Sequence, residues 1–215
     1  MLRTLLVIIT ITVTLSACSS NDNFQPLLTE DLAVQKTEYQ QQIVGHLSGE
    51  YVLADNTTIA SRWSKEEREL TRRYLKELLL QLNIEPQEQD YISPNLNFAI
   101  DLILGPFRGT NVYGILPATQ PSNEYIILGA HYDTGKRNAP GAIDNATGIA
   151  LIYSVVKEMT ELESRQKNIL VVFFDQEEEE LIGSRAFLEH IKQQQWDVHS
   201  IHCFDMVGWD EDQDK

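Results

Sequence analysis

The stretch from Asn168 to Glu180, NILVVFFDQEEEE, decides the fold. It begins with a continuous apolar run, which is typical of a strand buried on both faces of a sheet. Strand and helix patterns alternate around it, which indicates crossover connections and helices on both sides of the sheet. We therefore expect an α/β fold, a three-layer α/β/α sandwich with a mixed, largely parallel sheet. The predicted strands cover residues 97–104, 111–116, 124–129, 168–174 and 199–207, and the predicted helices among them cover residues 146–162 and 184–193.

Two further helices are predicted before this region. The first covers residues 31–45. The second begins at Ser64, because Ser64 and Glu67 have the spacing of a capping box, and it ends before Asn83. No internal repeat or low-complexity tract interrupts the chain, so we expect one domain over residues 30–215.

The composition excludes several classes of protein. Of 215 residues, 42% are hydrophobic and 23% charged, which is typical of a globular domain. The net charge of −15 argues against a nucleic-acid partner and against docking on an anionic membrane surface. The chain has two cysteines, Cys18 and Cys203, which are too few for a disulfide framework. Cys203 lies in an apolar run, so we expect it to be a small buried side chain.

The first residues have the features of a secretory signal. Residues 1–17 carry a positive charge followed by an apolar stretch that is too short to span a membrane. The sequence LSAC, ending at Cys18, resembles the bacterial lipobox, which implies an exported chain held at the cell envelope by lipid on Cys18. Residues 18–29 would be the tether, and Ser19 points to the outer membrane if the cell is Gram-negative. The alternatives are an ordinary cleavage site, with Cys18 a bystander, or a buried N-terminal strand.

Acidic residues and a histidine gather where the predicted strands end. Ligands of open α/β sheets bind at the carboxyl ends of the strands, so these side chains are expected at one edge of the sheet. One imidazole with several carboxylates suits zinc or a similar divalent ion. The residues concerned are His131, Asp133, Asp144, Asp175, the run Glu177–Glu180, and Asp205.

Each of these features also has a structural explanation. An isolated run of glutamates is usually a solvated face, and His131 alone would be interpreted as a core histidine. Asp144 and Asn145 could cap the helix that follows them. The convergence of several strand ends on one edge favours the metal site over these alternatives.

Four motifs resemble one known family. The strings GAHYDT (129–134), PGAIDNATG (140–148), EEEELIGS (177–184) and FDMVG (204–208) occur in the same order in the secreted di-zinc aminopeptidases, metallopeptidase family twenty-eight. Relatives in that family include glutamate carboxypeptidase, the transferrin receptor and glutaminyl cyclases. The resemblance covers residues 97–210 and implies a zinc-peptidase type of α/β/α sandwich with two zinc ions.

The resemblance also assigns roles to individual residues. His131 and Asp205 would hold one zinc ion, and Asp144 would bridge to the second, whose further ligand would be Glu178. Glu177 would be the general base that takes a proton from water and passes it to the leaving amine. Asp133 would orient His131.

The chain departs from the family pattern in two places. Glu180 stands where the family usually has glycine. The family's last ligand, a histidine on the second zinc, comes from beyond FDMVG, where this chain has few residues left. His190, His199 and His202 are poorly placed to substitute for it, so we interpret the chain as C-terminally truncated.

The sequence therefore predicts a lipid-anchored zinc aminopeptidase that removes N-terminal residues from peptides outside the cytoplasm. The alternatives are another amide hydrolase or a glutaminyl cyclase on the same scaffold, or an inactive, receptor-like or binding relative. Neither the preferred N-terminal residue nor the oligomeric state follows from the sequence.

Overall fold

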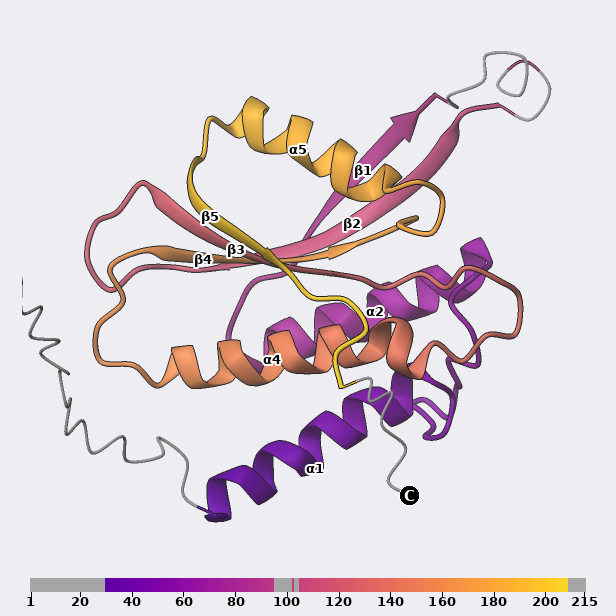
Figure 1. Cartoon of the computed structure of the whole chain (residues 1–215), viewed down its shortest axis with the longest axis horizontal. Coiled ribbons are helices and arrows are strands. Elements are labelled where there is room, and N and C mark those ends of the chain that lie inside the picture. The colour runs from indigo at the N-terminus through magenta and orange to yellow at the C-terminus, as the bar shows by residue number, and fades with distance from the viewer. Residues whose placement is uncertain (1–29, 95–101, 103–104, 209–215) are drawn as a thin grey trace, which may run out of the picture.

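The computed structural model describes residues 30–94, 102 and 105–208 (Figure 1). The predicted signal peptide (1–17) and the tether with Cys18 (18–29) lie outside the described residues. Nearly all of the strand predicted over residues 97–104 does so too. Among the helices of the described part of the chain, none combines the length and the apolar character that crossing a membrane requires.

Five strands form one mixed sheet in the order β1-β2-β4-β3-β5. β3 runs parallel to both β4 and β5, whereas β2 is antiparallel to β1 and β4. The expected α/β fold with a mixed sheet is confirmed, and its parallel part consists of the strands that precede the candidate ligands. The strands are β1 (Gln87–Ser93), β2 (Phe107–Leu116), β3 (Glu124–His131), β4 (Asn168–Phe174) and β5 (Asp197–Cys203).

Helices cover both faces of this sheet, as the three-layer prediction requires (Figure 1). On one face lie α2 (Lys65–Gln81) and α4 (Thr147–Thr160), with α1 (Glu30–Leu47) packed against α4. On the other face lies α5 (Ile182–Gln194). All side chains of β4 are buried between these layers, because the strand is central and has helices above and below it.

The start of α2 has the predicted capping box. Ser64 Oγ accepts a hydrogen bond from the backbone nitrogen of Glu67 at 3.2 Å, and Glu67 Oε2 accepts one from the backbone nitrogen of Ser64 at 2.8 Å. Both groups satisfy backbone donors that a helix leaves free at its first turn. Two residues before this cap, the side chain of Arg62 is buried in the protein interior.

The edges of the sheet differ from the sequence analysis in two ways. β1 is a strand that the sequence does not reveal, since only Tyr91 of QEQDYIS is buried and no alternation marks it. Cys203, expected to be buried, is exposed. The physical reason is that β5 is an edge strand of the described sheet, where apolar residues such as Ile201 are also half exposed. The predicted strand at 199–207 ends at Cys203, and the chain then turns toward η1, a short helical segment (Ala142–Ala146).

Candidate metal centre

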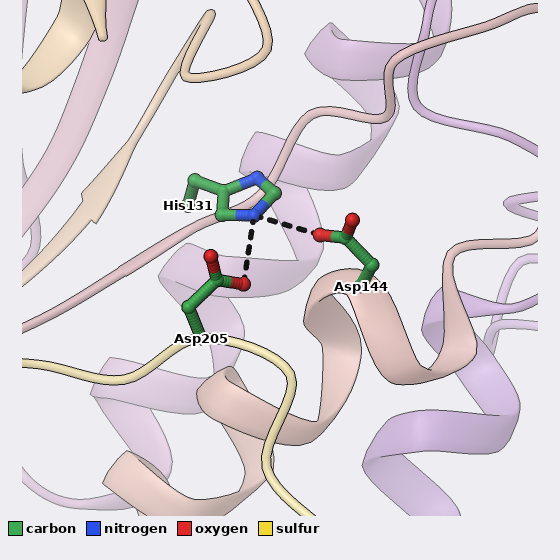
Figure 2. Close-up of side chains that lie close together, drawn as sticks. All are labelled: His131, Asp144 and Asp205. Atoms are coloured by element: carbon green, nitrogen blue, oxygen red, sulfur yellow. Dashed lines mark ion pairs between the residues drawn. The ribbon is translucent and has the colours of Figure 1, made fainter. Parts of the chain in front are cut away.

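Three of the four predicted metal ligands meet at the carboxyl edge of the parallel strands (Figure 2). His131 is the last residue of β3, and Asp205 follows the end of β5. Asp144 lies in η1, on the loop between β3 and α4. The sequence places them there because the strands run parallel and end at the same edge.

The ligand atoms of this group lie close together. His131 Nε2 is 2.9 Å from Asp144 Oδ1 and 3.5 Å from Asp205 Oδ1. One ligand atom from each of the three residues lies within 4.8 Å of the others. The imidazole is buried, whereas Asp205 is exposed, so the group is open to solvent on the Asp205 side.

The chemistry of this group fits a divalent cation. Both ring nitrogens of His131 and Oδ1 of Asp144 are buried and make no hydrogen bond of good geometry among the described residues; their close contacts are the ion pairs of His131 with Asp133, Asp144 and Asp205. Buried polar atoms without partners are costly, and native structures leave few of them. A metal ion between imidazole and carboxylate oxygens would satisfy these atoms, and this ligand set is one that zinc accepts.

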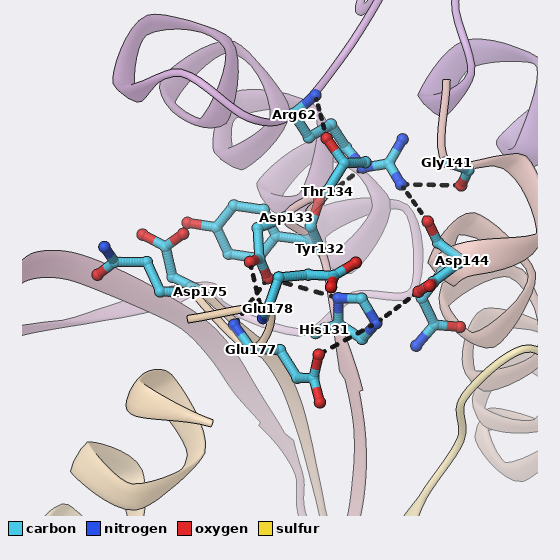
Figure 3. A network of polar contacts seen from close by, with 12 residues as sticks. Arg62, His131, Tyr132, Asp133, Thr134, Gly141, Asp144, Asp175, Glu177 and Glu178 are labelled. Carbon is cyan, nitrogen blue, oxygen red and sulfur yellow. Dashed lines mark hydrogen bonds and ion pairs between the residues drawn. The ribbon is translucent and has the colours of Figure 1, made fainter. Parts of the chain in front are cut away.

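Asp133 connects the histidine to the turn after β4 (Figure 3). Its side chain is buried, and its Oδ1 lies 3.4 Å from His131 Nδ1. The two carboxylate oxygens of Asp133 also accept hydrogen bonds from the backbone nitrogens of Glu177, at 2.9 Å, and Glu178, at 3.2 Å. Asp133 is therefore placed to orient the imidazole and to hold the turn with both glutamates.

The two glutamates occupy different positions. Glu177 Oε2 lies 3.9 Å from His131 Nε2, beside the three-residue group. Glu178 is not a member of that group, and its carboxylate lies so close to Gly135 that a Cβ added to this glycine would be 2.7 Å from Oε2. The predicted roles of Glu177 as base and of Glu178 as ligand stay predictions.

Burial and the surrounding charges shift the pKa values of His131, Glu177 and Glu178. Burial lowers the pKa of His131, but its interaction with Asp133 and the charge of Glu177 outweigh burial and raise the pKa to about 9. Burial raises the pKa of Glu177, and the nearby carboxylates add to that effect. Burial also raises the pKa of Glu178, followed in size by the charge of Asp144. The site thus holds a concentration of negative charge that a cation would neutralise.

The other histidines lie away from this centre, as expected from their positions in the sequence. His190 Nε2 is 3.2 Å from the hydroxyl of Tyr113, within an aromatic cluster under α5. His199 faces Glu124 at 3.6 Å. His202 Nε2 contacts Ser200 Oγ at 3.1 Å. None of them belongs to the metal-ligand group found among the described residues.

Two residues of the site were not identified from the sequence. Asn145, considered there only as a helix cap, is fully buried, and its Nδ2 donates to the carbonyl of Phe204 at 2.8 Å. Arg62 is also fully buried, and its guanidinium reaches the loop that carries Asp144 (Figure 3). Asn145 could have been identified from the sequence, because it directly follows Asp144 within the PGAIDNATG motif. No pattern in the sequence marks Arg62.

Comparisons with known proteins agree with this geometry. Residues 111–215 match the family described as peptidase family M28. A probable zinc metalloprotease of Pyrenophora tritici-repentis is 26% identical over 113 residues, which are 49% of this chain and 26% of that protein. A probable glutamate carboxypeptidase of Arabidopsis thaliana is 27% identical over 99 residues, 44% of this chain and 14% of that protein. The chain therefore spans about a quarter or less of these curated relatives.

Solved structures share the fold. The LapA aminopeptidase of Legionella pneumophila aligns with a TM-score of 0.58 and 19% identity, over 80% of this chain and 43% of that one. Glutaminyl cyclase of Porphyromonas gingivalis aligns with a TM-score of 0.61 and 17% identity, over 82% of this chain and 59% of that one. These likenesses confirm the fold, and the family match confirms the resemblance carried by the four motifs. Residues 111–215, which contain all four motifs, match peptidase family M28.

Proposed function

We propose that this chain carries the catalytic centre of a zinc-dependent aminopeptidase. The observation that carries the proposal is the meeting of His131, Asp144 and Asp205, in which the buried ring nitrogens of His131 and Oδ1 of Asp144 make no hydrogen bond of good geometry among the described residues. The family of residues 111–215 and relatives described as zinc metalloproteases support the choice of zinc and of peptide hydrolysis. When bound there, zinc would supply a Lewis acid that polarises a peptide carbonyl and acidifies water.

The chain's own residues would perform the remaining steps. Glu177 is proposed as the base that takes a proton from the attacking water and delivers it to the leaving amine. Its position beside His131 Nε2 and its raised pKa suit this role, because a general base works best when its pKa approaches the operating pH. Asp133 would hold His131 and the turn that carries Glu177 in fixed positions relative to each other.

We propose that Asp144 and Glu178 would together hold a second zinc ion. After burial, the charge of Asp144 contributes most to the raised pKa of Glu178, and this supports pairing the two carboxylates. Substrates would be peptides with a free N-terminus. If residues 1–17 are a secretory signal and Cys18 carries lipid, the protein would be anchored to the cell envelope and would bind these peptides outside the cytoplasm.

A glutaminyl cyclase is the second candidate. Glutaminyl cyclases are among the solved structures that share the fold, and the group His131, Asp144 and Asp205 is sufficient for a single ion. The two proposals differ in product. An aminopeptidase releases an amino acid from an aminoacyl-anilide, whereas a cyclase releases ammonia from a peptide that begins with glutamine.

One experiment compares both candidates. The purified chain is loaded with zinc, its metal content is measured, and it is assayed with leucine-anilide and with a glutaminyl peptide. His131→Gln is the test variant, and His202→Gln is the matched control because His202 is exposed and lies outside the ligand group. In a version of the protein that also supplies a histidine for the second zinc ion, we expect anilide hydrolysis that depends on His131 but not on His202. Ammonia release without anilide hydrolysis would establish the cyclase, and zinc binding without either product would overturn both proposals.

A further inference from the structure

Arg62 is a fully buried cation whose side-chain hydrogen bonds all go to backbone carbonyls (Figure 3). Its Nε donates to the carbonyl of Tyr132 at 2.6 Å, directly after β3. Its Nη1 donates to the carbonyl of Leu47, the last residue of α1. Side chains of arginine are rarely fully buried, and burial of an ion is costly unless its donors are satisfied.

The remaining donors of the guanidinium reach the loop that leads into η1. Nη1 donates to the carbonyl of Pro140 and Nη2 to that of Gly141, both at 2.8 Å. Nη2 also lies 3.5 Å from the carbonyl oxygen of Asp144. One planar group therefore joins the end of α1, the end of β3 and the loop that carries Asp144.

The loop and the guanidinium fit each other closely. Gly141 has a φ of +62°, in the left-handed region that favours glycine. A Cβ at this position would lie 2.3 Å from Nη2 of Arg62 and 2.6 Å from the carbonyl oxygen of Asp144. A side chain at Gly141 would thus separate the guanidinium from the backbone that it holds.

Charge adds to this mechanical role. Burial lowers the pKa of Arg62 to about 10, against the opposing charges of Asp133 and Asp144, so the group is a cation at neutral pH. The guanidinium interacts favourably with the negative charges of Asp133 and Asp144. Lysine would keep the charge but could not replace the planar fork of donors.

We propose that Arg62 is a positioning residue, whose guanidinium fixes the 140–144 loop so that the Asp144 carboxylate lies beside His131 Nε2. This inference rests on the proposed metal centre, but it concerns how the centre is held and not which reaction follows. It predicts that metal affinity depends on the planar set of N–H donors of the Arg62 guanidinium and not on its charge alone.

The test measures binding of Co²⁺, whose visible absorption reports the ligand geometry. We expect Arg62→Lys and Arg62→Met to weaken Co²⁺ binding by about 10- to 100-fold, the range seen when groups that orient metal ligands are removed. The Co²⁺ spectrum of Arg62→Lys should also change. Leu78→Ala is the control, because Leu78 is a buried residue of α2 and its loss should lower the melting temperature without altering the spectrum.

A second variant covers the case in which the Arg62 substitutions fail to fold. Gly141→Ala retains Arg62 and all core side chains, and it should show the same loss of Co²⁺ affinity. Wild-type affinity and spectrum in folded Arg62→Lys, or in Gly141→Ala, would overturn the positioning role. The proposed function fails separately, if the wild-type chain binds the metal but hydrolyses no peptide substrate.

Discussion

Oδ1 of Asp133 lies 2.9 Å from the backbone nitrogen of Glu177 and accepts its hydrogen bond. The same oxygen lies 3.4 Å from Nδ1 of His131. One buried carboxylate therefore links the last residue of β3 with the turn after β4. The proposed metal ligand and the proposed base are thereby fixed relative to each other, although η1, α4 and β4 lie between them in the chain.

Replacement of Asp133 by asparagine should weaken metal binding about 10- to 100-fold, because the amide nitrogen cannot accept the bonds that a carboxylate oxygen accepts. A competition titration between the protein and a coloured zinc chelator measures this change. Asp90→Asn is the control, since Asp90 is an exposed carboxylate that bonds Thr110. Unchanged affinity in Asp133→Asn would show that Asp133 does not orient the site.

In a version of the protein that also supplies a histidine for the second zinc ion, Glu177→Gln should leave the zinc content unchanged and lower turnover about 10²- to 10⁴-fold, the usual contribution of general acid–base transfer. Metal analysis and anilide hydrolysis are measured on the same sample. Glu180→Gln, a change at an exposed neighbour, serves as the control. A Glu177 variant that loses zinc but keeps its rate per bound ion would mean that Glu177 is a ligand and Glu178 the base.

Removal of metal should lower the melting temperature. Without a cation, buried atoms of His131 and Asp144 make no hydrogen bond of good geometry among the described residues, and the nearby carboxylates repel one another. Free zinc at a thousand times its dissociation constant should stabilise the fold by about 4 kcal/mol. Thermal melts with zinc and with chelator measure the difference, which should vanish in His131→Gln. An equal shift in that variant would place the bound zinc elsewhere.

Asp175→Asn should destabilise the fold by about 3–5 kcal/mol, because it breaks a buried ion pair and leaves Arg68 without its counter-charge. Asp175 Oδ1 lies 2.8 Å from Arg68 Nε, and the aspartate side chain is 1% exposed. Urea denaturation measures the loss. Asp55→Asn, which removes an exposed pair with Arg73, should cause no measurable change. Equal midpoints for both variants would contradict this prediction.

Cys18→Ala should abolish incorporation of labelled fatty acid and release the protein from the membrane fraction, if the lipobox is interpreted correctly. Labelling is measured in a bacterial host that processes lipoproteins. Cys203→Ala, which alters an exposed cysteine of β5, should label normally. Equal labelling of the Cys18 variant and the wild type would end the lipoprotein proposal.

Much of this architecture follows from local sequence. β4 has the predicted bounds because its side chains are nearly all apolar and all buried, so composition and burial agree. His131 and Asp205 meet because both follow parallel strands, and parallel strands end at one edge. β1 could not be predicted, since an edge strand with one buried side chain leaves no pattern.

Arg62 shows why the rest of the site is not readable from the sequence. Its burial depends on carbonyls supplied by α1, β3 and the η1 loop, and it is the folded arrangement that brings these together. The prediction that Cys203 is buried was wrong for a related reason. An apolar stretch predicts a strand, but burial also requires a neighbour on its outer side, which no described residue provides.

The Asn145 side chain couples local unfolding of the two segments that carry Asp144 and Asp205. It donates to the carbonyl of Phe204, and its Oδ1 accepts from the backbone nitrogens of Gly148, at 3.1 Å, and Met206, at 3.3 Å. The Asn145 side chain therefore connects the segments that carry Asp144 and Asp205, although these segments lie far apart along the chain. Local unfolding of either segment breaks the bonds of the other. The amide hydrogens of Gly148 and Met206 would then exchange with solvent together, and a metal ion held by both aspartates would dissociate in one cooperative event.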